Sequence, residues 1–144
     1  MVIVEKSVLV AYSAARMFEL VEDIEAYPQF LPWCSATQVK SRDERKTVAT
    51  LQVNYHGLRQ QFTTENQNQS ASLIEIRLID GPFRHLDGFW SFLPLAEDAC
   101  KIEFKLSYEL SGKLVDKLAG PVFNHIANTF VEAFVRRALF LYGG

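Results

Sequence analysis

The sequence has little of what most catalytic and metal sites require. Its 144 residues include two cysteines and three histidines. No group of His, Cys and carboxylate residues has the spacing of a metal site, and no glycine-rich phosphate loop is present. Cys34 and Cys100 lie far apart in the chain. One disulfide between them is an alternative, but we expect two buried, reduced thiols, as is usual in the cytosol.

Long apolar runs and an excess of basic residues are also missing. No uninterrupted apolar segment approaches the ~20 residues that span a bilayer. The first ten residues alternate and contain Glu5 and Lys6, which indicates a strand and not a signal peptide. The formal net charge is −2, so the chain has no overall basic field for DNA. We expect a cytoplasmic protein that does not bind DNA; the family resemblance given below adds the expectation of a peripheral place at the inner membrane.

Apolar and aromatic residues, in contrast, are plentiful. They make up 49% and 12% of the chain, with eleven phenylalanines. A chain of this length suits a single domain, residues 1–144, and buries about 68–70% of its unfolded surface. The composition therefore provides a full core and leaves apolar side chains over for another purpose.

Changes in the period of apolar residues predict the order of the elements. Residues 2–10 read as a strand, and Ser13 can cap a short helix with one apolar stripe. From Thr37 to Leu110 the period is two, which predicts six consecutive strands, with 66–70 as a polar connection between two of them. From about Lys113 to Leu141 the period returns to 3.6 and predicts a helix of roughly 40 Å.

The strand faces can be assigned from the alternation. Residues 100–110 place Cys100, Ile102, Phe104, Leu106, Tyr108 and Leu110 on one face and charged or small polar residues on the other. One face of the predicted antiparallel sheet is therefore dry, and the terminal helix is its natural cover. Pro121 should kink this helix or split off a first segment. The fold class is α+β.

The segment Ala26–Cys34, with the sequence AYPQFLPWC, carries three aromatic residues and two prolines but no charge. Prolines four residues apart disfavour a helix or a strand. We expect the segment to end the first helical region and to close one end of an apolar space below the long helix. The sequence leaves open whether Trp33 points into that space or outward toward a membrane or a partner.

Four blocks of the chain, in their order and spacing, resemble the START-like (helix-grip) family. The blocks are DIEAYPQFLPWC, DGPFRHLDGFWSFLPL, CKIEFKLSYEL and VFNHIANTFVEAFVRRA. The branch most similar to them contains the coenzyme Q-binding proteins and the RatA ribosome-association toxins. The resemblance implies a curved antiparallel sheet of six or seven strands around a long C-terminal helix, with one or two short helices after the first strand and an apolar cavity inside.

For function, the resemblance implies two alternatives that do not exclude each other. The first is binding of ubiquinone or another polyisoprenoid lipid in support of respiration. The second is a toxin that binds the large ribosomal subunit and blocks subunit association. No metal or other cofactor is implied. The residues that we expect to line the ligand cavity are Tyr27, Phe30, Leu31, Trp33, Leu51, Val53, Tyr55, Phe83, Leu86, Trp90, Phe92, Phe104, Leu106, Tyr108, Leu118, Val122, Ile126, Phe130 and Phe134.

The residues on the dry faces favour a ligand-binding protein over an enzyme. Acid–base catalysis needs an ionisable group within reach of the substrate, and the predicted inner faces offer almost none. His85 and Asp87 could act as a base and its orienting partner, but a solvated strand face is the simpler interpretation. Polar anchors for a ligand headgroup are limited to Tyr27, Tyr55 and Tyr108. A cyclase-like or hydrolase-like enzyme is a third alternative, and plain core packing a fourth.

Ribosome binding would use local basic clusters. These are Lys40, Arg42, Arg45 and Lys46 around one turn, Lys113 and Lys117 on one helical face, and Arg136 and Arg137 near the helix end. Each cluster alone is also typical of ordinary solvated surface, so the ribosome hypothesis depends on the family resemblance.

Overall fold

The protein is described by a computed structural model that covers residues 1–69 and 72–143. Ser70, at the end of the expected connection 66–70, lies outside the described residues. The elements follow in the order β1 (Val2–Val10), α1 (Ala14–Glu22), the 3-10 helix η1 (Ile24–Gln29), β2 (Cys34–Arg42), β3 (Lys46–Tyr55), β4 (Leu58–Gln69), β5 (Leu73–Asp80), β6 (Phe83–Ala96), β7 (Ala99–Leu110) and α2 (Lys113–Tyr142).

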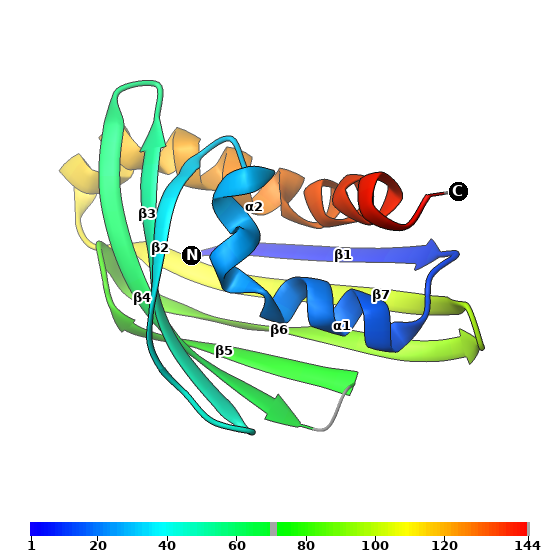
Figure 1. Cartoon of the computed structure of the whole chain (residues 1–144). Coiled ribbons are helices and arrows are strands. Elements are labelled where there is room, and N and C mark those ends of the chain that lie inside the picture. The colour runs from blue at the N-terminus through cyan, green and yellow to red at the C-terminus, as the bar shows by residue number, and fades with distance from the viewer. Residues whose placement is uncertain (70–71, 144) are drawn as a thin grey trace.

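The seven strands form one antiparallel sheet in the order β1-β7-β6-β5-β4-β3-β2. Neighbouring strands in the chain are paired throughout β2 to β7, and β1 closes the far edge by pairing with β7. The sheet is strongly curved, and α2 lies across its concave side, while α1 and η1 close the side between the two sheet edges (Figure 1). This arrangement confirms the predicted helix-grip architecture.

The dry face assigned from alternation is confirmed in β7 and largely in β3. In β7, Cys100 and Ile102 are fully buried and Phe104 is 2% exposed, whereas Glu103 is exposed. In β4 the prediction was too short: the strand continues through residues 66–69, which we expected to form a connection. Asn66 pairs with Thr47 on one side and Ile76 on the other, so sheet pairing overrides the weak strand preference of asparagine.

The helix α1 begins where the sequence predicts it. The Ser13 hydroxyl accepts a hydrogen bond from the backbone N–H of Arg16, the usual role of an N-cap serine. Met17, Leu20 and Val21 form the buried stripe. The 3-10 helix η1 follows directly and contains Pro28, so the proline-containing segment is partly helical and not fully irregular as the prolines suggested.

The C-terminal helix α2 runs without interruption for 30 residues, and the predicted split at Pro121 does not occur. Pro121 lies on the exposed side of the helix, where water can bond to the backbone carbonyl that the proline leaves free. The buried residues in the first half of α2 are Ala119, Gly120, Phe123, Ile126 and Ala127, so Ile126 is buried as expected and Leu118 and Val122 are not. The predicted stripe through Leu118 and Val122 is therefore rotated by about one residue, because apolar side chains occur on both faces there.

Gly88 allows β6 and β7 to approach closely. A Cβ atom at this position would lie 2.1 Å from the backbone oxygen of Lys105. No side chain fits at that distance. A glycine within a strand commonly marks such a close approach or a bend, and this one lies in β6, the longest strand described.

Candidate ligand-binding cavity

A cavity of about 90 Å³ lies between the concave face of the sheet, the α1–η1 segment and α2. Its wall is almost entirely apolar. The residues that line it are Val21, Ile24, Tyr27, Trp33, Leu51, Phe62, Thr64, Asn66, Ile76, Phe83, Leu86, Trp90, Phe104, Leu106, Tyr108, Phe123, Ile126, Ala127 and Phe130. Five of the seven strands, both short helices and α2 contribute to this wall, so no single element forms the site.

Eleven of the nineteen residues expected at a cavity do line it. They are Tyr27, Trp33, Leu51, Phe83, Leu86, Trp90, Phe104, Leu106, Tyr108, Ile126 and Phe130. Trp33 is 3% exposed and lines the cavity, so the open question about its direction is answered. Binding of a ligand by these residues stays a prediction.

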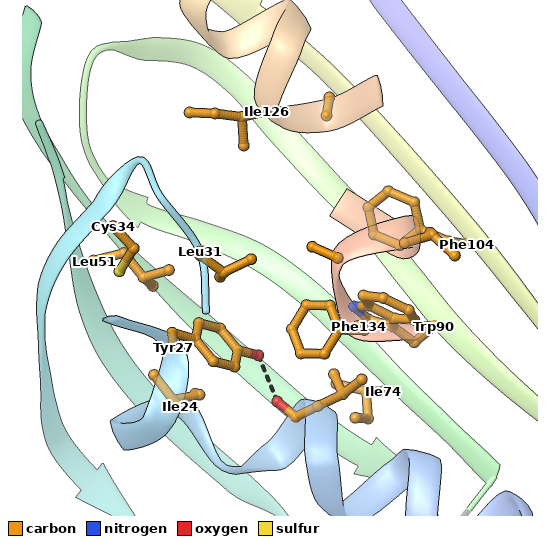
Figure 2. Close-up of a cluster of buried hydrophobic side chains, with 14 of the residues drawn as sticks. Ile24, Tyr27, Leu31, Cys34, Leu51, Ile74, Trp90, Phe104, Ile126 and Phe134 are labelled. Carbon is orange, nitrogen blue, oxygen red and sulfur yellow. Dashed lines mark hydrogen bonds between the residues drawn. The ribbon is translucent and has the colours of Figure 1, made fainter. Parts of the chain in front are cut away.

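The other eight expected residues lie outside the cavity wall. Leu31, Val53, Phe92 and Phe134 are buried in the surrounding core, and Figure 2 shows Phe134 beside Trp90 and Tyr27. Phe30 packs on Phe134 and beneath the guanidinium of Arg137. These five side chains belong to the hydrophobic packing that surrounds the cavity wall.

Three of the eight expectations are corrected by the position of α2. Leu118 is 63% exposed, and Val122 is half-buried outside the wall. Tyr55 stacks on His125 of α2 with ring centroids 5.6 Å apart and planes within 8°, so its ring holds the helix against the β3 end instead of facing a ligand.

Eight wall residues were not expected. They are Val21, Ile24, Phe62, Thr64, Asn66, Ile76, Phe123 and Ala127. Phe62, Thr64 and Asn66 alternate along β4 and share one face, so alternation along this strand would have found them. Phe123 and Ala127 line the cavity because of how α2 is rotated against the sheet. The sequence carries no signal for that rotation.

The ionisable groups on the wall are two tyrosines, and both are neutral and hydrogen-bonded. The Tyr27 hydroxyl donates to the Val21 backbone oxygen at 2.5 Å, shown as the dashed line in Figure 2. Burial raises the pKa of Tyr27 above its ordinary value. The Tyr108 hydroxyl donates to Oδ1 of Asn124, and burial raises the pKa of Tyr108 to about 12. Neither group titrates near neutral pH, so neither is suited to general acid–base chemistry.

The other potentially reactive groups lie away from the cavity. His85 and Asp87 form a 3.5 Å pair on the outer face of the sheet, 39% and 56% exposed, as a solvated strand face predicts. Cys34 and Cys100 are free and buried, as expected, and burial raises the pKa of the Cys34 thiol to about 11. Within residues 1–69 and 72–143 no cluster of His, Cys, Asp and Glu could hold a metal ion. None of the helices described is long and apolar enough to cross a membrane.

Comparison with known proteins places this architecture in a family. Residues 10–135 match the family model described as polyketide cyclase / dehydrase and lipid transport. The ribosome association toxin RatA of Pseudomonas aeruginosa is 45% identical over 140 residues, 97% of each chain. The mitochondrial coenzyme Q-binding protein COQ10 homolog B of Xenopus laevis is 28% identical over 96% of this chain and 58% of its own length.

Solved structures agree with this assignment. A START superfamily protein from Mycobacterium smegmatis superposes with a TM-score of 0.74 at 28% identity, over 94% of this chain and 95% of that one. The Zhui aromatase/cyclase from Streptomyces superposes with a TM-score of 0.79 over 99% and 98% of the two chains, but at 16% identity this likeness concerns the fold alone. The chain belongs to the polyketide cyclase / dehydrase and lipid transport family of START-like helix-grip proteins, in the branch that holds RatA and the coenzyme Q-binding proteins.

Proposed function

We propose that this protein binds an apolar ligand of the polyprenyl quinone class, ubiquinone in the first place, without chemically changing it. It would then support respiration as a carrier or chaperone. The single observation that carries this proposal is the cavity wall: apart from Thr64 and Asn66 its side chains are aromatic or aliphatic, and it contains no carboxylate, amine or imidazole. Such a wall favours an apolar ligand and disfavours acid–base catalysis.

The cavity is too small to hold a quinone with its tail unless the wall moves. Sites for drug-sized ligands enclose ~300–1,000 Å³, whereas this cavity encloses about 90 Å³. A headgroup and tail therefore require the wall to open. Ten buried methylene equivalents contribute about 8 kcal/mol, against ~4–15 kcal/mol for association and ordering. Tight binding consequently depends on a long tail.

Two built-in reporters make this proposal testable. The chain has two tryptophans, and Trp33 and Trp90 both line the cavity. Quinones accept electrons from excited indole, so titration with decyl-ubiquinone should quench the intrinsic fluorescence in a saturable way. Trp33→Phe and Trp90→Phe should each retain part of the quenching, because each leaves one reporter in the wall.

Native mass spectrometry of the protein purified from its host, with organic extraction, identifies the bound lipid. Reproducible absence of any quinone or lipid, together with no saturable quenching and no thermal shift by decyl-ubiquinone, would refute the ligand proposal.

A second function, RatA-type action on the large ribosomal subunit, is supported by the 45% identity to a ribosome association toxin over 97% of both chains. Several of the basic residues considered for it are already paired. Arg42 binds both carboxylate oxygens of Glu25, at 2.9 and 3.0 Å, and Lys46 lies 3.2 Å from Glu65. Lys113 and Lys117 are exposed and have no ion pair within the described residues.

Sucrose-gradient profiles test this second function. Induction of the protein in bacterial cells should cause free subunits to accumulate at the expense of 70S particles. Replacing Lys113 and Lys117 together by glutamate should reduce the effect, whereas Lys101→Glu on the sheet should leave it unchanged. An unchanged gradient after induction of the wild-type protein would argue against this function.

A further inference from the structure

One end of the cavity carries a polar group whose donors are unused. Asn66 lies in the C-terminal half of β4, and its backbone pairs with Thr47 of β3 and Ile76 of β5. Its side chain belongs to the cavity wall, as do those of Thr64, Val21, Ile24 and Ile76. Two residues further along β4, the side-chain amide of Asn68 donates a hydrogen bond to Glu22 of α1, so this part of β4 and the Asn66 amide lie at the end of the cavity that α1 and η1 close.

Thr64 fixes the orientation of this amide. The Thr64 hydroxyl, in a residue that is 5% exposed, donates a 3.2 Å hydrogen bond to Oδ1 of Asn66. The oxygen side of the amide is thereby occupied. Asn66 is half-buried, and no hydrogen-bond partner of its Nδ2 is found among residues 1–69 and 72–143, so two N–H donors remain for a ligand.

The other polar groups of the wall are not equivalent to Asn66. The hydroxyl protons of Tyr27 and Tyr108 are already donated to Val21 and Asn124. A second part of the wall, four residues or about 13 Å before Asn66 along β4, is formed by Phe62 with Phe83 and Phe123, whose ring centroids lie 4.9 to 6.1 Å apart. The cavity thus has a donor end and an aromatic end.

We propose that Asn66 donates a hydrogen bond through Nδ2 to a carbonyl oxygen of the bound ligand and so selects headgroups that carry one. The ligand lies with its headgroup at the α1–η1 end and its tail toward Phe62, Phe83 and Phe123. This inference rests on the proposed ligand function and adds the polar group that the ligand must contain. A half-buried donor on an otherwise apolar wall favours ligands that bring an acceptor over ligands that have none.

The test compares two probes of equal tail length: decyl-ubiquinone, which has ring carbonyls, and decylbenzene, which has none. Asn66→Leu keeps the size of the side chain and removes the donors. It should weaken decyl-ubiquinone binding about tenfold, the scale of one hydrogen bond in apolar surroundings, and leave decylbenzene binding unchanged. Thr64→Val, which frees the amide to rotate, should weaken quinone binding by a smaller factor.

Asn54→Leu provides the matched control, because Asn54 is an exposed asparagine of the neighbouring strand β3. It should leave the binding of both probes unchanged. A second readout needs no variant: the infrared carbonyl stretch of bound decyl-ubiquinone should move to lower wavenumber in the wild-type protein. That readout decides the matter if Asn66→Leu fails to fold.

The outcomes separate this inference from the proposed function. Wild-type protein that binds neither probe overturns both. Wild-type protein that binds both probes, with Asn66→Leu affecting them equally or not at all and with no carbonyl shift, overturns the role of Asn66 and leaves the apolar cavity function standing. A selective loss of quinone binding, or a carbonyl shift that disappears in Asn66→Leu, supports the inference.

Discussion

Adjacent residues of β7 have opposite environments. Phe104 is 2% exposed and lies in the cavity wall, with its ring 4.8 Å from that of Trp90 and 5.7 Å from that of Phe130. Glu103 lies on the outer face, where it forms a 3.3 Å ion pair with Lys101. The loss of folding stability caused by a substitution should therefore differ strongly between these two neighbouring positions.

We expect Phe104→Asp to lower the free energy of unfolding by at least about 3–5 kcal/mol, because it removes a core ring and buries a carboxylate. Glu103→Ala should change it by less than about 1 kcal/mol, since exposed ion pairs contribute little. Urea denaturation followed by circular dichroism measures both. Equal effects of the two substitutions would contradict the assignment of faces.

At the scale of elements, a carboxylate links β3, β4 and β5 on the outer face of the sheet. Glu65 of β4 lies 3.2 Å from Nζ of Lys46 and 2.9 Å from a guanidinium nitrogen of Arg77, and it accepts a hydrogen bond from Gln67. These contacts, that of Arg77 first, lower the pKa of Glu65 from its ordinary 4.5 to about 2.

The lowered pKa predicts a pH dependence of stability. A carboxylate whose folded-state pKa is lowered stabilises the fold fully above about pH 4.5 and loses this contribution as the pH falls toward 2. The difference in melting temperature between the wild type and Glu65→Gln should therefore shrink across this window. Glu75→Gln, at an exposed position of β5 without an ion pair in the described part of the chain, should show a much smaller change.

A second prediction at this scale concerns the pairing of β6 with β7. Gly88→Ala would place a Cβ atom 2.1 Å from the Lys105 oxygen, so the two backbones must separate. We expect a loss of at least about 1–3 kcal/mol, the usual cost of inserting atoms where no space exists, measured as a lower urea midpoint. Leu93→Ala in the same strand, at a residue that is 53% exposed, is the control and should cost much less.

At the scale of the whole molecule, the cavity exists only because α2 and the sheet do not fill the space between them. Ala127 of α2 is 2% exposed and lines this space. Ala127→Leu should fill much of the cavity of about 90 Å³, keep or raise stability by about 0.5–2 kcal/mol, and abolish quenching by decyl-ubiquinone.

The same variant tests whether the two proposed functions are independent. If ligand binding and ribosome action are separate, Ala127→Leu should still shift the sucrose-gradient profile as the wild type does. Undiminished quinone binding by a stably folded Ala127→Leu protein would contradict the location of the ligand site.

The order of the elements and the dry faces of the strands could be predicted because both depend on local patterns. A strand alternates with period two whatever it packs against, so Phe104 and Glu103 could be assigned to faces from their neighbours. An N-cap depends on one side chain and the next three residues, so Ser13 could be placed as well. The family resemblance added how the elements assemble.

The sequence by itself, with its family resemblance, determined that this protein is an α+β helix-grip chain. It also indicated that the chain has more apolar side chains than the core needs. Only the tertiary structure decided which of them enclose a space. The rotation of α2 about its own axis turns Phe123 and Ala127 toward the cavity and leaves Leu118 63% exposed. The pairing of β4 with β5 as far as Gln69 holds Asn66 within the sheet, with its side chain in the cavity wall. Both follow from contacts between segments far apart in the chain, which no local pattern records.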